Sequence, residues 1–195
     1  MNQPQTVTIR ALTPELLDDY LAFFDHDAFA DNPKWGFCYC RLHHFPHAQR
    51  NWCETTAAEN REAVAGLIRD GILQGYLAYC GDKPVGWCNA GPRTRMTTTP
   101  DYDEPEAEVT GSIMCFVIAK EHRRQGIARQ LLEAACAGFK AQGFTIAEAY
   151  VLKGAEGDAM NYPGPLAMYL AAGFEVTREA CCDGDDTLIV RKRLA

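Results

Sequence analysis

The sequence predicts a single α/β domain of the α+β type, in which helices flank a mixed sheet. Its 195 residues lie within the size that one hydrophobic core supports, so residues 1–195 are expected to form one unit. Hydrophobic residues make up 47% of the chain and charged residues 23%, the balance of a globular protein. Helical and strand-like patterns follow one another in the order β-α-α-β-β-β-α-β-α-β-β. The central β-α-β part suits a right-handed parallel crossover, and hairpins supply antiparallel edges.

The first quarter of the chain is expected to contain a strand, a helix and a long loop. Val7–Arg10 has the pattern of a short strand. Thr13 and Pro14 match a helix N-cap followed by proline at the first helical position. Apolar residues at helical spacing extend this helix to about Ala28: Leu16, Leu17, Tyr20, Leu21 and Phe24. Residues 31–53 have no clean period, so a loop with a helical turn is expected there.

A second helix and a hairpin follow. Thr56 and Glu59 have the spacing of a capping box, and Gly71 is a typical helix terminator. The segments Gly75–Cys80 and Val85–Asn89 are strand-like and are separated by a short turn sequence. They are therefore expected to pair as an antiparallel hairpin.

Beyond a polar, acidic loop over residues 97–108, further strands and helices are expected. The nearly continuous apolar run 111–119 predicts a strand buried on both faces. A third helix follows residues 123–128, buries an apolar stripe between residues 127 and 139, and ends at Gly143. The remaining elements are strands over 145–151, 174–178 and 187–194, and a short helix over Pro165–Ala172.

Charge and composition disfavour several classes of protein. The chain has 26 acidic and 19 basic residues, a net charge of −7, which argues against DNA or RNA as a ligand. No apolar run approaches the roughly 20 residues of a membrane helix, and Met1–Gln5 lacks the features of a secretory signal. Nine cysteines, an odd number, argue against a complete disulfide framework. The sequence therefore predicts a cytoplasmic protein that binds neither nucleic acid nor membrane.

Residues 123–128 have the features of a phosphate-binding loop. A helix N-terminus offers unpaired N–H groups and partial positive charge to an anion, and this loop stands just before one. Gly126 and Ala128 allow a pyrophosphate to approach the backbone, and Arg123 and Arg124 add charge. A strand–helix connection with solvated arginines is the alternative. A nicotinamide site and a P-loop are disfavoured, because the three-glycine fingerprint and Gly-Lys-Ser/Thr are both absent.

Two motifs together indicate a family. Arg123-Arg124-Gln125-Gly126-Ile127-Ala128 matches a Gln/Arg-x-x-Gly-x-Gly/Ala signature, and Tyr169–Phe174 matches a Tyr-x-x-x-Gly-Phe segment. On these motifs the chain resembles the GNAT superfamily of N-acetyltransferases. The resemblance implies a mostly antiparallel central sheet that is flanked by helices and splayed at an acetyl-CoA cleft. It also implies acetyl-CoA as the acetyl donor.

The same resemblance implies roles for individual residues. Three consecutive residues are expected to bind the pantetheine arm through their backbone, one N–H polarising the thioester carbonyl: Phe116, Val117 and Ile118. The pyrophosphate is expected on the loop residues Arg123, Arg124, Gln125, Gly126, Ile127 and Ala128. Tyr169 is expected to protonate the departing thiolate as general acid, and a buried core tyrosine is the alternative.

The general base is left open by the sequence. Some histone-type relatives carry a glutamate base in the strand before the loop, and this chain has Ser112 at that position. Glu108, or an acid within residues 101–106, is the remaining candidate and would act through a water molecule.

The acceptor is expected to bind between the first two helices. The substrate-binding candidates are three aromatic residues and one acid: Trp35, Tyr39, Trp52 and Glu108. Cys38 and Cys40 make a metal site a rival hypothesis, but they are separated by one residue and zinc pairs usually by two to four. Packing is the favoured role of these thiols, and no metal is expected.

These features predict an N-acetyltransferase that moves an acetyl group from acetyl-CoA to a primary amine of a small molecule or peptide, by direct attack. Two other functions remain open, a non-catalytic acyl-CoA-binding regulatory module and an acetyltransferase of a protein partner. The aromatic acceptor region favours small molecules. The sequence does not define the oligomeric state, and a homodimer is compatible with it.

Overall fold

The computed structural model describes residues 6–99, 105–155, 157–182 and 185–194. Its seven strands form one sheet in the order β1-β2-β3-β4-β5-β7-β6, and every neighbouring pair is antiparallel except β4 with β5. The strands are β1 Val7–Ala11, β2 Gly75–Cys80, β3 Lys83–Pro92, β4 Thr110–Ile118, β5 Ile146–Leu152, β6 Glu175–Cys182 and β7 Asp185–Arg193. The mixed, mostly antiparallel sheet and its parallel crossover through β4 and β5 confirm the predicted fold class.

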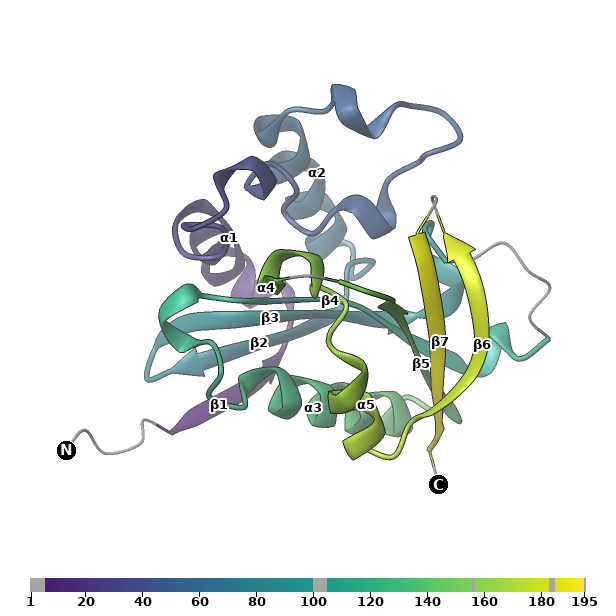
Figure 1. Ribbon diagram of the computed structural model, residues 1–195. Coiled ribbons are helices and arrows are strands. Elements are labelled where there is room, and N and C mark those ends of the chain that lie inside the picture. The colour runs from purple at the N-terminus through teal and green to yellow at the C-terminus, as the bar shows by residue number, and fades with distance from the viewer. Residues whose placement is uncertain (1–5, 100–104, 156, 183–184, 195) are drawn as a thin grey trace.

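Helices cover both faces of this sheet. They are α1 Leu17–His26, α2 Ala57–Arg69, α3 Ile127–Ala141, α4 Gly157–Met160 and α5 Leu166–Ala171. In Figure 1, α1 and α2 lie above the sheet and α3 and α5 lie below it. Two buried clusters correspond to these layers, one with Phe24 and Val64 on the α1–α2 side and one with Leu131 and Tyr169 on the α3–α5 side. None of the helices in the described ranges is both long and apolar enough to span a membrane.

Local sequence signals explain where the first two helices start. At α2 the capping box is present, because Thr56 Oγ1 accepts from Glu59 N at 3.2 Å and Thr56 N donates to Glu59 Oε2 at 2.9 Å. The segment that starts at Thr13 opens as a 3₁₀ turn over Pro14–Leu16 before α1 begins. The long loop that follows α1 contains three 3₁₀ turns, Pro33–Trp35, Leu42–His44 and Trp52–Glu54, where one helical turn was expected. Helix α4 was not expected either.

The predicted splay lies in the middle of β4. The register of β3 against β4 shifts where Asn89 pairs with Cys115 and the next residue pairs with Ile113, which makes Met114 the extra residue of a bulge. Pairing of β4 with β5 ends at Ile113 and Ala149, although β5 continues alongside β7 to Leu152. The last five residues of β4 therefore separate from β5 and leave their backbone open to another group.

A close approach of α3 to β4 holds the helix that follows the splay. A Cβ atom on Gly111 would lie 2.5 Å from the ring of Phe139, so only glycine lets this ring pack against the strand. Gly111 precedes the splay, and Phe139 belongs to the last turn of α3. This contact anchors the last turn of α3 on β4.

Candidate active site

The loop between β4 and α3 contains two residues in the left-handed backbone region. Arg124 has a φ of 61° and Gly126 a φ of 79°, and such turns direct successive N–H groups toward one side, the geometry of an anion-binding nest. The first hydrogen bond within α3 runs from Gln130 N to Gly126 O at 3.2 Å, so the N–H groups before Gln130 have no partner inside the helix. The loop thus combines a nest with the positive end of a 15-residue helix, an arrangement that suits a pyrophosphate.

A cavity of about 430 Å³, here called the loop cavity, opens beside this turn. Its lining is Phe116, Ile118, His122, Arg123, Arg124, Gly126, Ile127, Ala128, Arg129, Asn161, Gly164, Pro165 and Met168. Seven of the nine residues expected at the cofactor are among them, and Val117 and Gln125 are not. The side chain of Gln125 instead donates from Nε2 to the carbonyl oxygen of Glu121 at 3.0 Å.

The splayed edge of β4 presents backbone groups of alternate residues. Phe116 N donates to the carbonyl oxygen of Tyr162 at 2.6 Å, on the side that β5 has left, and Ile118 O accepts from Arg123 on that side. Because successive residues of a strand face opposite neighbours, the N–H and C=O of Val117 face β3. This direction does not favour the backbone of Val117 for the pantetheine arm, whereas Phe116 and Ile118 face the splayed side.

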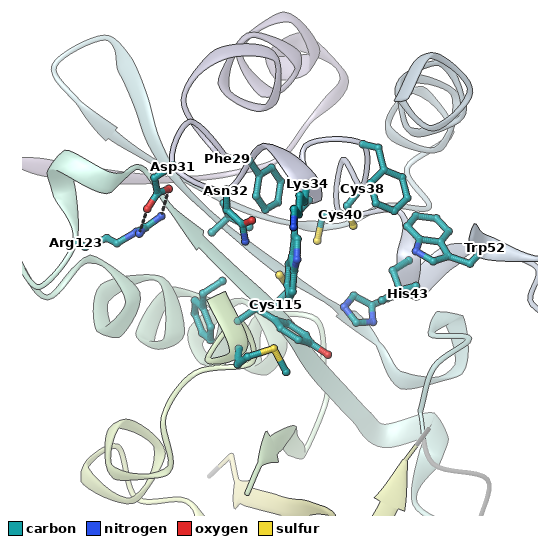
Figure 2. Close-up of a pocket in the computed structure, with 17 residues that line it drawn as sticks. Phe29, Asp31, Asn32, Lys34, Cys38, Cys40, His43, Trp52, Cys115 and Arg123 are labelled. Carbon is teal, nitrogen blue, oxygen red and sulfur yellow. Dashed lines mark hydrogen bonds and ion pairs between the residues drawn. The ribbon is translucent and has the colours of Figure 1, made fainter. Parts of the chain in front are cut away.

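A second and larger cavity, of about 820 Å³ and here called the aromatic cavity, lies on the α1–α2 side of β4 (Figure 2). Its lining is Phe29, Asp31, Asn32, Lys34, Trp35, Phe37, Cys38, Cys40, Leu42, His43, Trp52, Cys115, Phe116, Val117, Arg123, Met160 and Tyr162. Two residues, Phe116 and Arg123, line both cavities. The two spaces therefore adjoin at the splayed part of β4.

The structure brings together two of the four substrate-binding candidates. Trp35 and Trp52 line the aromatic cavity. Tyr39 is buried beneath it and donates its hydroxyl to Asp25 Oδ1 at 2.6 Å. Glu108 is exposed and belongs to a 3₁₀ turn before β4, seven residues from Cys115, so it lines neither cavity. The geometry thus gives no support to Glu108 in substrate binding or as the base, and residues 101–104 lie outside the described ranges.

Arg123 connects the loop to the segment after α1. Its guanidinium makes a bidentate pair with Asp31, with N–O distances of 2.6 and 2.9 Å, and its Nε donates to Ile118 O at 3.0 Å. Figure 2 shows this pair at one end of the aromatic cavity. The hydrogen bond from Arg123 holds the pKa of the Asp31 carboxyl below its ordinary value. Arg123 therefore positions two cavity walls against each other rather than only adding charge.

Tyr169 is fully buried beside the loop cavity. Its hydroxyl donates to Pro163 O at 2.6 Å, and burial raises its pKa well above the ordinary value, so the phenol stays protonated at neutral pH. A Cβ atom on Gly164 would lie 3.2 Å from the ring of Tyr169 and 3.3 Å from that of Phe116, and both Gly164 and Phe116 line the cavity. Tyr169 itself does not line the loop cavity, and the partner of its hydroxyl is a backbone carbonyl.

Two further polar groups of the aromatic cavity, His43 and Cys38, are neutral. Burial, with smaller contributions from His44 and His47, lowers the pKa of His43 to about 3, and its Nδ1 lies 2.6 Å from Thr98 Oγ1. Burial raises the pKa of the Cys38 thiol to about 12. Within the described part of the chain, no group of three or more His, Cys, Asp or Glu residues is arranged to hold a metal ion.

Several lining residues were not predicted from the sequence. Lys34 and Asp31 belong to an aperiodic loop, and nothing in their spacing distinguishes them from solvated residues. Arg129 had a usable signal, because it stands in the first turn of α3 beside the loop. The segment Tyr162-Pro163-Gly164-Pro165, by contrast, is a sequence candidate for the border of the cofactor cleft, because it precedes the tyrosine helix. It contributes to both cavities, Tyr162 to one and Gly164 to the other.

Comparison with known proteins agrees with this geometry. The family model described as "Acetyltransferase (GNAT) family" matches residues 13–162, which is most of the chain. A search of curated proteins returned no match. Solved structures also match this chain, at sequence identities of 13–18%, and at such identities the similarity shows the fold alone.

Three solved structures illustrate this likeness. An N-acetyltransferase from Staphylococcus aureus Mu50 is 16% identical with a TM-score of 0.60, over 97% of this chain and 99% of that one. A ribosomal-protein-alanine N-acetyltransferase from Brucella melitensis is 18% identical with a TM-score of 0.58, over 96% and 99%. A putative acetyltransferase from Salmonella typhimurium, solved with its cofactor acetyl-CoA, is 13% identical with a TM-score of 0.55, over 97% and 94%. With the family model, the splayed sheet and the anion-binding loop in agreement, the chain belongs to the GNAT acetyltransferase family.

Proposed function

We propose that this protein transfers the acetyl group of acetyl-CoA by direct attack of a primary amine, on a small molecule or a peptide. Acetyl-CoA is the acetyl donor of the GNAT family, and one structural neighbour was solved with it. The observation that carries the proposal is the junction of two cavities at Phe116, on the splayed edge of β4. A donor in the loop cavity and an amine in the aromatic cavity would meet at that residue.

The residues of the loop cavity fit the shape and charge of this cofactor. Arg124 and Gly126 form the nest for the pyrophosphate, and the backbone of Phe116 and Ile118, which faces the splayed side, suits an extended amide-containing arm. Phe116 N–H would bind the thioester carbonyl and stabilise the negative charge that develops on its oxygen. In the structure this N–H donates to Tyr162 O, so Tyr162 must release it when the cofactor binds.

The kind of amine is supported by the walls of the aromatic cavity. Trp35 and Tyr162 have ring centroids 5.8 Å apart, and Phe37 and Trp52 have theirs 5.4 Å apart. Such walls enclose a small molecule or the end of a peptide better than the side of a folded partner. Among structural neighbours, one is titled a putative phosphinothricin N-acetyltransferase and another a ribosomal-protein-alanine N-acetyltransferase, so both kinds of acceptor occur on this fold.

A thiol-release assay tests the proposal. Purified protein is mixed with acetyl-CoA and a panel of primary amines, and free CoA thiol is measured together with the mass of the acetylated product. Release that depends on an amine is the expected result. If acetyl-CoA binds in a calorimeter but no amine in the panel releases thiol, the protein is a non-catalytic CoA-binding module and the proposal fails.

Tyr169→Phe should lower kcat about 100-fold, the usual size of general-acid catalysis, with little change in the KM for acetyl-CoA. To act as the acid, the phenol must exchange its bond to Pro163 O for one to the departing thiolate. Its ring lies beside Gly164 and Phe116, which line the loop cavity. Steady-state kinetics and a urea titration of the variant are measured together. Loss of the bond to Pro163 by itself costs about 1 kcal/mol of stability. An unchanged kcat with reduced stability would leave Tyr169 with a structural role only.

A further inference from the structure

The aromatic cavity is rich in aromatic rings. Among the described residues the rings are those of Phe29, Trp35, Phe37, Trp52, Phe116 and Tyr162. Offset and edge-on ring contacts are favourable at the centroid distances between these rings. A flat ring of a ligand in this space would therefore bury apolar surface and also make favourable contacts with the wall rings. The cavity of about 820 Å³ is large enough for a molecule with one or two fused rings.

The charges of the same wall favour an anion. Its described cations are Lys34 and Arg123, and its one described carboxylate, Asp31, is bonded bidentately to Arg123. Lys34 makes no ion pair with another residue in the described ranges. His43 adds no charge, since burial lowers its pKa to about 3. The cavity therefore keeps a positive charge at Lys34, in a chain whose net charge is −7.

The order of these groups along the cavity indicates how a ligand would lie. In Figure 2 the Asp31–Arg123 pair is at one end, Trp52 and His43 are at the other, and Lys34 and Cys115 lie between them. Cys115 directly precedes Phe116, where the two cavities join. An amine at Cys115 and an anionic group at Lys34 would therefore share the part of the cavity between these ends, while a ring attached to them would extend toward Trp52.

We propose that the acceptor is an aromatic α-amino acid, or an amine that carries the same flat ring and the same carboxylate beside the amino group. The inference rests on the proposed function, because it names the acceptor of that site. A polyamine would find no carboxylate among the described lining residues other than the one already bonded to Arg123. A positive site also disfavours the ammonium form of a bound amine, and only the neutral form is a nucleophile.

Matched pairs of acceptors test the carboxylate. We compare kcat/KM in the thiol-release assay for L-tryptophan and tryptamine, and for L-phenylalanine and phenethylamine, with spermidine as a polycation. The amino acid of each pair should be used about tenfold better, which corresponds to about 1.4 kcal/mol. Equal or better use of tryptamine, phenethylamine or spermidine would overturn the inference and leave the proposed function intact.

Substitutions of Lys34 test its role in this preference. Lys34→Gln should remove most of the difference within each pair, and Lys34→Glu should reverse it, with the KM for acetyl-CoA unchanged. Lys140→Gln is the matched control, because Lys140 is an exposed lysine in the last turn of α3 and lines neither cavity. A preference that persists in Lys34→Glu would contradict the assignment of Lys34 to the carboxylate.

A binding measurement separates failure of this inference from failure of the proposed function. Indole-3-propionate, which has the ring and carboxylate but no amine, is titrated by calorimetry into wild type and Lys34→Glu in the absence of acetyl-CoA. Binding to wild type that is weakened at least about tenfold in the variant is expected. If this binding is observed but no amine releases thiol, the inferred acceptor site is supported and the proposed acetyl transfer is contradicted. If indole-3-propionate does not bind, the inference is wrong whatever the turnover.

Discussion

Replacing Gly126 by valine is expected to weaken acetyl-CoA binding about 100-fold, a loss of nearly 3 kcal/mol. Gly126 has a φ of 79°, a conformation that costs a residue with a side chain roughly 1–2 kcal/mol and a β-branched residue more. A valine would move the backbone toward negative φ, turn the nest N–H groups away from the cavity and displace the start of α3. Calorimetric titration of CoA and acetyl-CoA into the variant gives the affinity directly.

Gly143 offers a matched control for this substitution. It follows the other end of α3, has a φ of 88°, and like Gly126 has no atom within 4 Å of an added Cβ. Gly143→Val should therefore lose similar stability, more than roughly 1–2 kcal/mol because valine is β-branched, while its CoA affinity stays at the wild-type value. If both variants bind CoA as the wild type does, the anion site is not at the loop. If both lose affinity equally, the effect reflects stability and not the site.

Features encoded by residues close in sequence were predictable. The capping box at Thr56 and Glu59 needs only a spacing of three, and the loop before α3 combines a small residue with a helix start. The long apolar run of β4 predicted a strand buried on both faces, and a buried parallel neighbour followed from it. In each case the determining interactions lie within one turn of helix or one strand.

Features set by distant residues were not predictable. Asp31 and Arg123 are 92 residues apart, and neither motif nor spacing links them. The backbone direction of Val117 depends on the bulge at Met114, because one extra residue reverses which groups face β3. The partner of the Tyr169 hydroxyl, Pro163 O, depends on how the segment before α5 folds back. The sequence pattern can assign such residues to a helix, strand or loop. The tertiary packing decides which groups they face.

Glu148 lies at the base of the splay and connects strands on both sides of it. It is fully buried on β5, where it pairs with Ser112 of β4 one residue before the two strands separate. Its Oε1 accepts from Arg93 Nε at 3.1 Å, its Oε2 accepts from Arg191 Nε at 2.6 Å, and the hydroxyl of Tyr150 also donates to it. Arg93 follows β3 and Arg191 belongs to β7, so one carboxylate joins the strands that flank β4 and β5. This group was not predictable from the sequence, because an acid inside an apolar strand carries no sign of its partners.

Glu148→Gln is therefore expected to lower the free energy of unfolding by about 3 kcal/mol, since removing one member of a buried ion pair leaves its partners without their counter-charge. Glu133→Gln is the control: Glu133 pairs with Arg129 at 3.6 Å, with side chains 62% and 69% exposed, and its loss should cost less than about 0.5 kcal/mol. Urea titrations followed by circular dichroism measure both. Because Glu148 holds the strands where the splay opens, the folded variant should also bind acetyl-CoA more weakly than Glu133→Gln does. A stability loss equal to that of the control would mean that the carboxylate only replaces solvent around the two arginines, and that the splay is held open by the bulge at Met114 alone.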